Sequence, residues 1–232
     1  MFCVVGGGPA GLASAIRLKQ LAPELSVAVL EKSSEIGGHI VSGNIFDTRA
    51  LDELLPEWRN QFGKTTPDQI SAPFPFRAPK LRNNLGVVTI PGASAARVLL
   101  DEGNQVRGVR LRDEGINKQG LKSQRYERGM RVLSKQLILA EGCRGSLSEF
   151  IKQHFNLVQN SCPQRYALGL KEVWEINPSL HSPGAAIHTV GWPLNYNTFG
   201  GGFLYHHFSV DNKPLLHVGF VVGLDYKNPW IK

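Results

Sequence analysis

The sequence has few cysteines, and they are scattered. Its 232 residues include only Cys3, Cys143 and Cys162, which lie far apart and form no C-x-x-C pair. An odd, dispersed set argues against a disulfide scaffold and favours a reducing compartment. It also argues against a metal or iron–sulfur site built within this chain, so the sequence predicts no metal ligands.

Long apolar runs are also missing. A membrane-spanning helix needs about 18 or more consecutive apolar residues, and no stretch of this length occurs. No targeting segment precedes the first expected strand, which starts at about residue 2. We therefore expect either that the protein needs no presequence or that its true beginning lies outside the sequence.

Acidic residues are fewer than basic ones. The chain has 26 Lys and Arg against 19 Asp and Glu, which gives a net charge of +7 and a pI of about 9.5. A basic surface is compatible with nucleic acid, anionic lipid or an acidic protein, and equally with plain solvation. Nucleic-acid binding is not predicted, because the basic residues are dispersed without an aromatic-rich recognition motif. No Ser/His/Asp or Cys/His constellation suggests a catalytic nucleophile either.

Glycine is abundant at the N-terminus, where it forms a recognisable pattern. Gly6, Gly8 and Gly11 follow the spacing G-x-G-x-x-G. Apolar patterning predicts a strand at 2–5 before them, a helix at 9–22, and a second strand at 25–31. A strand, glycine turn, helix and strand within about thirty residues is the context that this motif requires for dinucleotide binding.

Each residue of this motif has a separate expected role. Gly6 permits the tight turn, Gly8 lets the backbone approach a pyrophosphate, and Gly11 allows close packing of helix and strand. The helix N-terminus offers N–H groups to the phosphates. Glu31 follows Gly11 by 20 residues, so its carboxylate can accept hydrogen bonds from ribose hydroxyls and would repel a 2′-phosphate. With Lys32 beside Glu31, these are the predicted cofactor-binding residues; a glycine turn without a ligand is the alternative, and the motif alone does not separate FAD from NAD.

The rest of the chain is expected to alternate short elements with irregular stretches. We predict a helix at 47–58, capped by Asp47, and then a proline-rich excursion at 59–84. A hairpin at 96–113, a strand at 136–142 and a helix at 146–155 follow. From residue 163 onward the chain is expected to be β-rich. The adjacent His206 and His207 would point to opposite faces of a strand, and both are expected to be structural.

Several long strings resemble the electron transfer flavoprotein–ubiquinone oxidoreductase family, within the glutathione-reductase-like flavoproteins. They cover residues 30–43, 127–130, 139–150, 169–174, 188–194, 200–206 and 219–230, in the family's order. The resemblance implies an α/β fold with a Rossmann-like FAD-binding domain over 1–160. It implies a β-rich ubiquinone-binding domain over 161–232, incomplete in this chain. The likeness also favours FAD as the cofactor.

The resemblance further implies an electron relay. Electrons would arrive from reduced electron transfer flavoprotein and leave to ubiquinone, in a monotopic enzyme on the matrix side of the mitochondrial inner membrane. The cytoplasmic side of a bacterial plasma membrane is the alternative. The family's quinone-contacting pair falls on Gly200 and Gly201, although Phe199 and Gly202 stand where the family usually has tyrosine and serine. From the residues alone, this glycine run suits close backbone approach to a flat ligand, a β-bulge or a sharp corner.

The chain also departs from the family pattern. The family's membrane-inserted segment would include roughly 36–56, but the acidic residues there favour a helix packed on the protein core. A strand and a helix of the family are missing between 83–86 and 90–100. The four cysteines for a 4Fe-4S cluster, with the C-terminal iron–sulfur domain, would lie beyond Lys232. Two alternatives stay open: a geranylgeranyl-reductase-like or FixC-like reductase, and an inactive truncated fragment.

Overall fold

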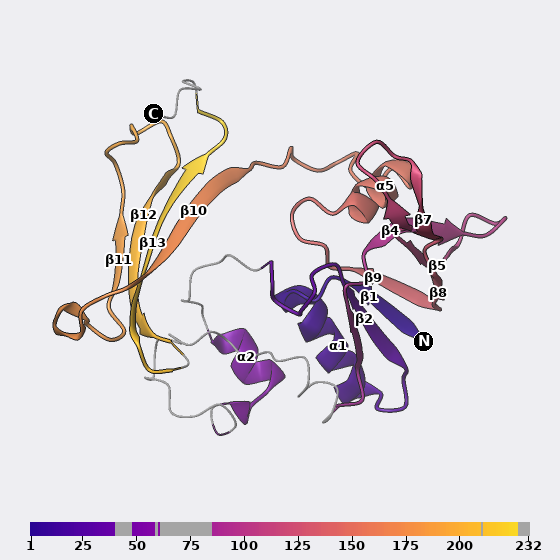
Figure 1. Ribbon diagram of the computed structural model, residues 1–232, viewed down its shortest axis with the longest axis horizontal. Coiled ribbons are helices and arrows are strands. Elements are labelled where there is room, and N and C mark those ends of the chain that lie inside the picture. The colour runs from indigo at the N-terminus through magenta and orange to yellow at the C-terminus, as the bar shows by residue number, and fades with distance from the viewer. Residues whose placement is uncertain (40–47, 59, 61–84, 210, 227–232) are drawn as a thin grey trace. The chain divides into compact units, whose positions relative to one another are not determined.

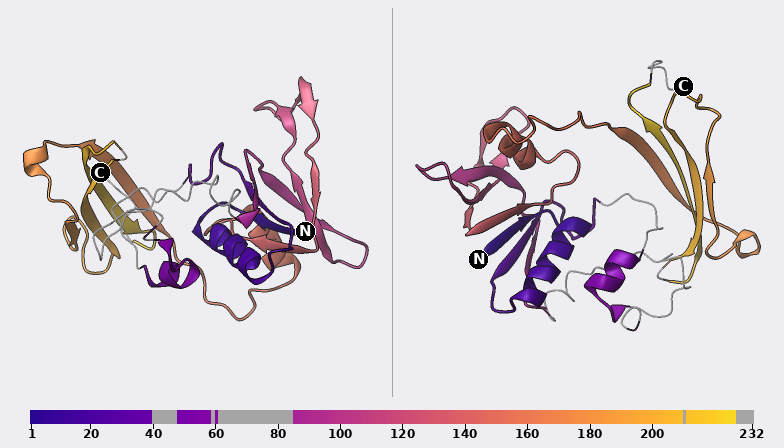
Figure 2. Two further views of the ribbon diagram at one scale, coloured as in Figure 1. Left: turned by 90° about the horizontal axis from the view of Figure 1, so that it is seen from below. Right: turned by 180° about the vertical axis from the view of Figure 1, so that it is seen from behind.

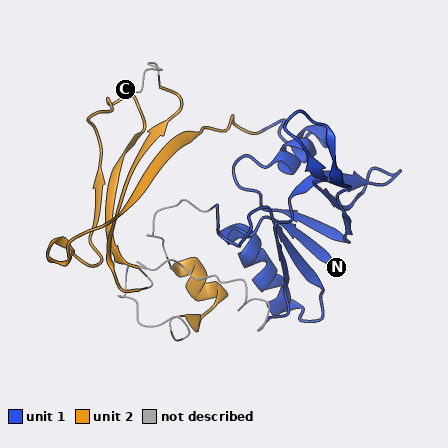
Figure 3. Cartoon of the chain, in the orientation of Figure 1, with its two compact units in different colours: residues 1–40, 76–160 blue, residues 41–75, 161–232 orange. Residues whose placement is uncertain are grey.

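The chain forms two compact units (Figure 3). The computed structural model describes residues 1–39, 48–58, 60, 85–209 and 211–226 (Figure 1). Unit 1 comprises Met1–Ile40 and Phe76–Asn160, and unit 2 comprises Val41–Pro75 and Ser161–Lys232. Unit 2 therefore includes residues 41–75, which the expected division grouped with 1–160. The cap Asp47, most of the excursion 59–84 and part of the proposed membrane segment 36–56 lie outside the described residues.

A parallel sheet forms the centre of unit 1. Its strand order is β3 (Val88–Pro91), β2 (Val27–Glu31), β1 (Phe2–Val5) and β9 (Gln136–Leu139). All three pairings are parallel. Helix α1 (Pro9–Leu21) connects β1 to β2 and lies along the sheet in both views of Figure 2. The expected strand, helix and strand at the N-terminus are thus confirmed.

Side chains alternate between the two faces of this sheet and build two cores. On one face Val4, Val27 and Val29 pack with Ala15 of α1. On the other face Cys3, Val5 and Leu30 pack with the second layer of the unit. Strand β2 is buried along its full length, which is typical of a parallel strand that is covered on both sides.

The second layer of unit 1 is antiparallel. Strands β4 (Ala95–Leu100), β5 (Val106–Leu111) and β8 (Arg131–Leu133) form one sheet, so the hairpin expected at 96–113 is confirmed. Strands β6 (Glu114–Ile116) and β7 (Lys122–Glu127) pair separately. Helix α5 (Ser146–His154) follows β9, close to the expected 146–155.

Unit 2 is built on a four-stranded antiparallel sheet. Its order is β10 (Ala167–Glu175), β13 (Pro214–Gly223), β12 (Gly200–Phe208) and β11 (Ala186–Thr189). The expected β-rich character is confirmed. A short 3₁₀ turn, η1 (Pro178–Leu180), precedes β11.

The same unit contains the helix α2 (Arg49–Leu54), which is shorter than the expected 47–58. Thr48 is its N-cap residue, and the helix ends because Leu55 precedes Pro56, a position that disfavours helical backbone. Trp58 is buried and donates from Nε1 to Asp52 Oδ1 at 2.7 Å. None of the helices among the described residues has the length and apolar character to cross a bilayer.

The two faces of the unit 2 sheet differ in chemistry. The strand registers place the side chains of Lys171, His188, Phe203, Tyr205, His207 and His217 on one face, which we call the histidine face. The other face is largely apolar and carries, among others, Leu170 and Trp174 of β10. The neighbours His206 and His207 lie on opposite faces, as expected, and His207 is buried.

Candidate functional site

The glycine turn of unit 1 requires glycine at two positions for packing reasons. Gly6 has a φ of +105°, and a Cβ there would lie 2.2 Å from the carbonyl oxygen of Ala140. A Cβ on Gly11 would lie 1.9 Å from the carbonyl oxygen of Gly6. The expected tight turn at Gly6 and close helix packing at Gly11 are therefore confirmed.

Gly8 differs from both, because open space surrounds it. No atom lies within 4 Å of a Cβ built on Gly8. Gly8 is the N-cap of α1 and offers no side chain to cap the helix, while Pro9 follows at the first helical position. The first N–H groups of a helix have no partners within the helix, and they carry its positive dipole end. An anion can therefore approach the backbone here.

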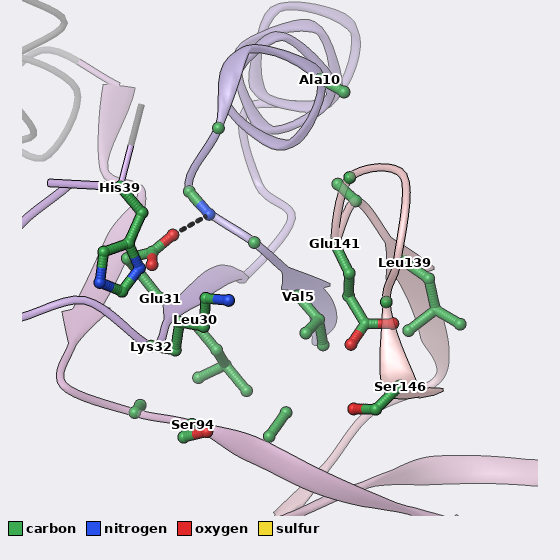
Figure 4. Close-up of a pocket in the computed structure, with 18 of the residues that line it drawn as sticks. Val5, Ala10, Leu30, Glu31, Lys32, His39, Ser94, Leu139, Glu141 and Ser146 are labelled. Atoms are coloured by element: carbon green, nitrogen blue, oxygen red, sulfur yellow. Dashed lines mark hydrogen bonds between the residues drawn. The ribbon is translucent and has the colours of Figure 1, made fainter. Parts of the chain in front are cut away.

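Glu31 holds the glycine turn in place from the end of β2. Its Oε2 accepts from the Gly7 N–H at 2.8 Å (Figure 4), and its Oε1 accepts from the Ser33 N–H at 2.8 Å. The side chain is buried. A carboxylate has about four acceptor positions, so two remain for a ligand.

A cavity of about 650 Å³ opens at this point. It lies at the carboxyl ends of β1, β2 and β9, the usual place of a ligand in an open α/β sheet. Gly6, Gly8, Glu31 and Lys32 line it, while Gly11 lies beneath them against the turn. Every described lining residue belongs to unit 1.

Sequence reasoning missed Glu141, which also lines the cavity (Figure 4). Its Oε2 accepts from the N–H and the hydroxyl of Ser148 at 2.7 and 2.8 Å, so it caps α5. The N-cap residue Gly145 has no side chain for this task. The available signal is an acidic residue between a buried strand and a helix start.

The predicted pair Gly200 and Gly201 lies in unit 2, at the start of β12. Their φ angles are +145° and +156°. A Cβ on Gly200 would lie 2.1 Å from the Val221 carbonyl oxygen, and one on Gly201 would lie 2.0 Å from that of Thr189. The register runs without a shift from Gly200 to Phe208, so this is not a β-bulge: neighbouring strands leave no room for side chains.

The histidine face brings together titratable groups that are distant in sequence. His188 Nε2 lies 2.7 Å from Tyr205 Oη, and the rings of His207 and His217 are 4.0 Å apart. Burial, with His207 and Lys171 nearby, lowers the pKa of His217 to about 4. Burial is also the main cause that lowers the pKa of His207. Both rings are therefore neutral near pH 7.

Two known families match parts of the chain. Residues 166–232 match the family described as "ETF-QO, ubiquinone-binding". Residues 4–59 match the family described as "NAD(P)-binding Rossmann-like domain". These stretches contain the histidine face and the glycine turn, respectively.

Whole-chain relatives carry a consistent name. The chain is 44% identical to the mitochondrial electron transfer flavoprotein-ubiquinone oxidoreductase of Arabidopsis thaliana, over 98% of this chain and 41% of the relative. It is 40% identical to that of Sus scrofa, over 98% of this chain and 42% of the relative. The chain thus spans less than half the length of these curated relatives.

A solved structure supports the fold. The flavoprotein/dehydrogenase of Cytophaga hutchinsonii aligns with a TM-score of 0.54 at 16% identity, over 100% of this chain and 57% of that one. At this identity the likeness concerns the fold alone. Along nearly its full length the chain is therefore similar to electron transfer flavoprotein–ubiquinone oxidoreductases, of whose length it covers less than half.

Proposed function

We propose that this chain is the FAD-binding and quinone-binding part of an oxidoreductase that passes electrons from reduced electron transfer flavoprotein to ubiquinone. One observation carries the proposal. Unit 1 has a cavity at its glycine turn, and residues 166–232 of unit 2 match a ubiquinone-binding family. The electron donor and acceptor come from the names of the relatives.

The residues around the cavity suit the ADP half of FAD. The open approach to Gly8 and the uncapped start of α1 suit the pyrophosphate. The two unused acceptor positions of Glu31 suit the ribose hydroxyls. The volume of about 650 Å³ lies within the usual range of ligand sites, about 300–1,000 Å³. The bound flavin would supply the redox chemistry.

Glu31 and Lys32 would also select the cofactor. The Glu31 carboxylate is fixed by two backbone N–H groups, so it cannot easily turn away from a 2′-phosphate and would repel it. Lys32 lines the cavity with its side chain exposed and can approach the phosphates. The site therefore favours FAD over a phosphorylated nicotinamide dinucleotide.

Gly200 and Gly201 are the proposed quinone contacts. A flat ring would meet backbone N–H and C=O groups of this glycine-rich strand end, where no side chain of the pair projects. Carbonyl oxygens of β11 and β13 occupy the positions that Cβ atoms of the pair would take, so only glycine fits here.

We also propose a membrane surface as the working environment, in keeping with the solubility of ubiquinone in lipid. The segment between β11 and β12 exposes four large side chains, those of Val190, Trp192, Tyr196 and Phe199. Trp and Tyr favour the membrane–water interface. The names of the relatives favour mitochondria, and we place the protein on the matrix side of the inner membrane.

An iron–sulfur cluster does not fit this chain. A 4Fe-4S cluster takes four cysteine ligands, and the sequence has three cysteines. Cys3 is buried in β1, whereas Cys162 lies in unit 2. No electron step is therefore assigned to a cluster here.

The test begins with the purified protein and added FAD. We expect a yellow protein from which heat releases FAD, and flavin bleaching by reduced electron transfer flavoprotein with reoxidation by ubiquinone-1. Glu31→Gln places an amide N–H₂ against a backbone N–H, and should weaken FAD binding about tenfold, the cost of about 1.4 kcal/mol. Glu35→Gln, an exposed residue outside the cavity, is the matched control. A protein that stays colourless with excess FAD would refute the proposal.

A further inference from the structure

Unit 2 carries a hydrogen-bonded histidine and tyrosine close to the glycine pair, Gly200 and Gly201. His188 on β11 pairs with Phe203 on β12, and Phe203 lies two residues after Gly201. His188 Nε2 and Tyr205 Oη are 2.7 Å apart, with their rings in an edge arrangement. This pair therefore joins β11 to β12 on the histidine face.

Aromatic packing fixes the position of Tyr205. Its ring stacks on Phe203, with centroids 4.7 Å apart. The Phe203 ring in turn lies over Gly219 of β13, where a Cβ would be 2.0 Å from the Phe203 Cζ. Tyr205 is 9% exposed, and burial raises the pKa of its hydroxyl, which therefore stays protonated. His188 is exposed, and its Nε2 contacts the Tyr205 hydroxyl, so Nδ1 is the ring nitrogen that remains for another partner.

We propose that His188 gives a proton to one carbonyl oxygen of the bound quinone, and that Tyr205 is the residue that positions it. This inference rests on the proposed function. The inference goes further than the proposed function, because it names the residue that donates a proton during quinone reduction.

The proposed step balances in electrons and protons. Reduction of a quinone to a quinol takes two electrons, which the flavin supplies under the proposed function, and two protons. As an imidazolium, His188 directs Nε2–H to Tyr205 Oη and transfers its Nδ1 proton to the quinone oxygen. One O–H bond forms and one N–H bond breaks. The neutral ring regains a proton from water, which also supplies the second proton of the quinol.

The spacing suits a ring bound between the glycine pair and the histidine. Two residues along a strand span about 7 Å, and His188 stands directly across from the residue at the end of that span, Phe203. The two carbonyl oxygens of ubiquinone lie at opposite ends of a six-membered ring. One can therefore meet the backbone at Gly201 while the other faces His188.

The other titratable groups of the histidine face are less suited to this role. Lys171 of β10 pairs with Gly219, on the far side of β13 from β12. His207 of β12 and His217 of β13 are buried, and burial lowers the pKa of each. Buried neutral rings neither carry an extra proton nor exchange one readily with water. Among these groups only His188 combines exposure with a fixed orientation.

The kinetic test uses the full protein, reduced electron transfer flavoprotein and ubiquinone-1. His188→Gln should lower kcat for quinone reduction about 100-fold, a usual loss for a general acid, and leave flavin reduction by the donor unchanged. Tyr205→Phe keeps the ring stacking and should cost less. In His188→Ala, added imidazole should restore part of the rate, which a purely structural role would not allow. His206→Gln, on the opposite face of β12, is the matched control.

A binding measurement tests the same assignment without turnover. In the NMR spectrum of the wild-type protein, ubiquinone-1 should shift the ring resonances of His188 and leave those of His154 in unit 1 in place. Unshifted His188 resonances, or His188→Gln kinetics equal to wild type, would overturn the proton assignment and leave the proposed function standing. If the wild-type protein reduces no ubiquinone, the proposed function fails, and the proton assignment fails with it.

Discussion

At the scale of single residues, the glycine turn separates two kinds of glycine. Gly11→Ala would drive a Cβ to 1.9 Å from the Gly6 carbonyl, so α1 must move away from β1. We expect a loss of about 1–3 kcal/mol in the free energy of unfolding, the usual cost of overpacking. Gly8→Ala meets no atom within 4 Å and has an extended backbone that alanine accepts. It should leave stability nearly unchanged and weaken FAD binding.

Urea unfolding and a flavin titration on both variants measure the two effects separately. If Gly11 serves packing and Gly8 faces the ligand, Gly11→Ala lowers the urea midpoint of unfolding. Gly8→Ala lowers the affinity for FAD and leaves that midpoint unchanged. A Gly8→Ala protein that binds FAD as tightly as wild type would contradict a ligand-facing role for Gly8.

His217 makes the stability of unit 2 depend on pH. Its pKa of about 4 in the folded state is below the usual value of about 6.5 in an unfolded chain. As pH falls from 6.5 to 4, the unfolded chain therefore binds a proton that the folded chain refuses, and stability falls. At 1.36 kcal/mol per unit, the loss from this group approaches about 3 kcal/mol. His217→Leu should remove it.

Urea unfolding at pH 7 and pH 4.5 compares the wild type with this variant. His154→Gln in α5 is the control, because His154 lies in unit 1 and outside the histidine face. If His217 causes the effect, the free energy of unfolding of His217→Leu drops less between pH 7 and pH 4.5 than that of the other two proteins. Equal drops in all three would assign the pH dependence to other groups.

At the scale of elements, one carboxylate connects three segments of unit 1. Asp113 accepts from Arg110 of β5 at 2.8 Å, from the Tyr126 hydroxyl of β7 at 3.2 Å and from the Gly129 N–H at 2.9 Å. Asp113→Ala should therefore loosen the β6–β7 hairpin from β5. Trypsin should then cleave faster after Lys122 or Arg125 of β7, which mass spectrometry can locate. Glu102→Ala, in the exposed β4–β5 turn, is the control and should keep the wild-type cleavage pattern.

The elements also show which features a sequence reveals. Strand β1 and helix α1 were predictable, because apolar runs and glycine spacing are local signals. Helix α2 ended earlier than predicted, because Pro56 acts on the residue before it. The conformations of Gly200 and Gly201 depend on carbonyls of other strands, and the contact between His188 and Tyr205 depends on the register of β11 and β12. Such features arise from pairing between distant segments, which composition and periodicity do not encode.

At the scale of the whole molecule, the placement of the cavity predicts where ligand binding will stabilise the chain. All described residues that line the cavity belong to unit 1, so FAD should stabilise the elements around it. A ligand at 100 times its Kd adds about 2.7 kcal/mol to the folded state that binds it. In hydrogen exchange followed by mass spectrometry, FAD should slow exchange in β1, β2 and β9 about 100-fold, because 1.4 kcal/mol corresponds to a factor of ten. Strands β10, β12 and β13 should exchange as before. Equal slowing of hydrogen exchange in both sheets would instead mean that the two units unfold together, so that FAD binding also stabilises the sheet of unit 2.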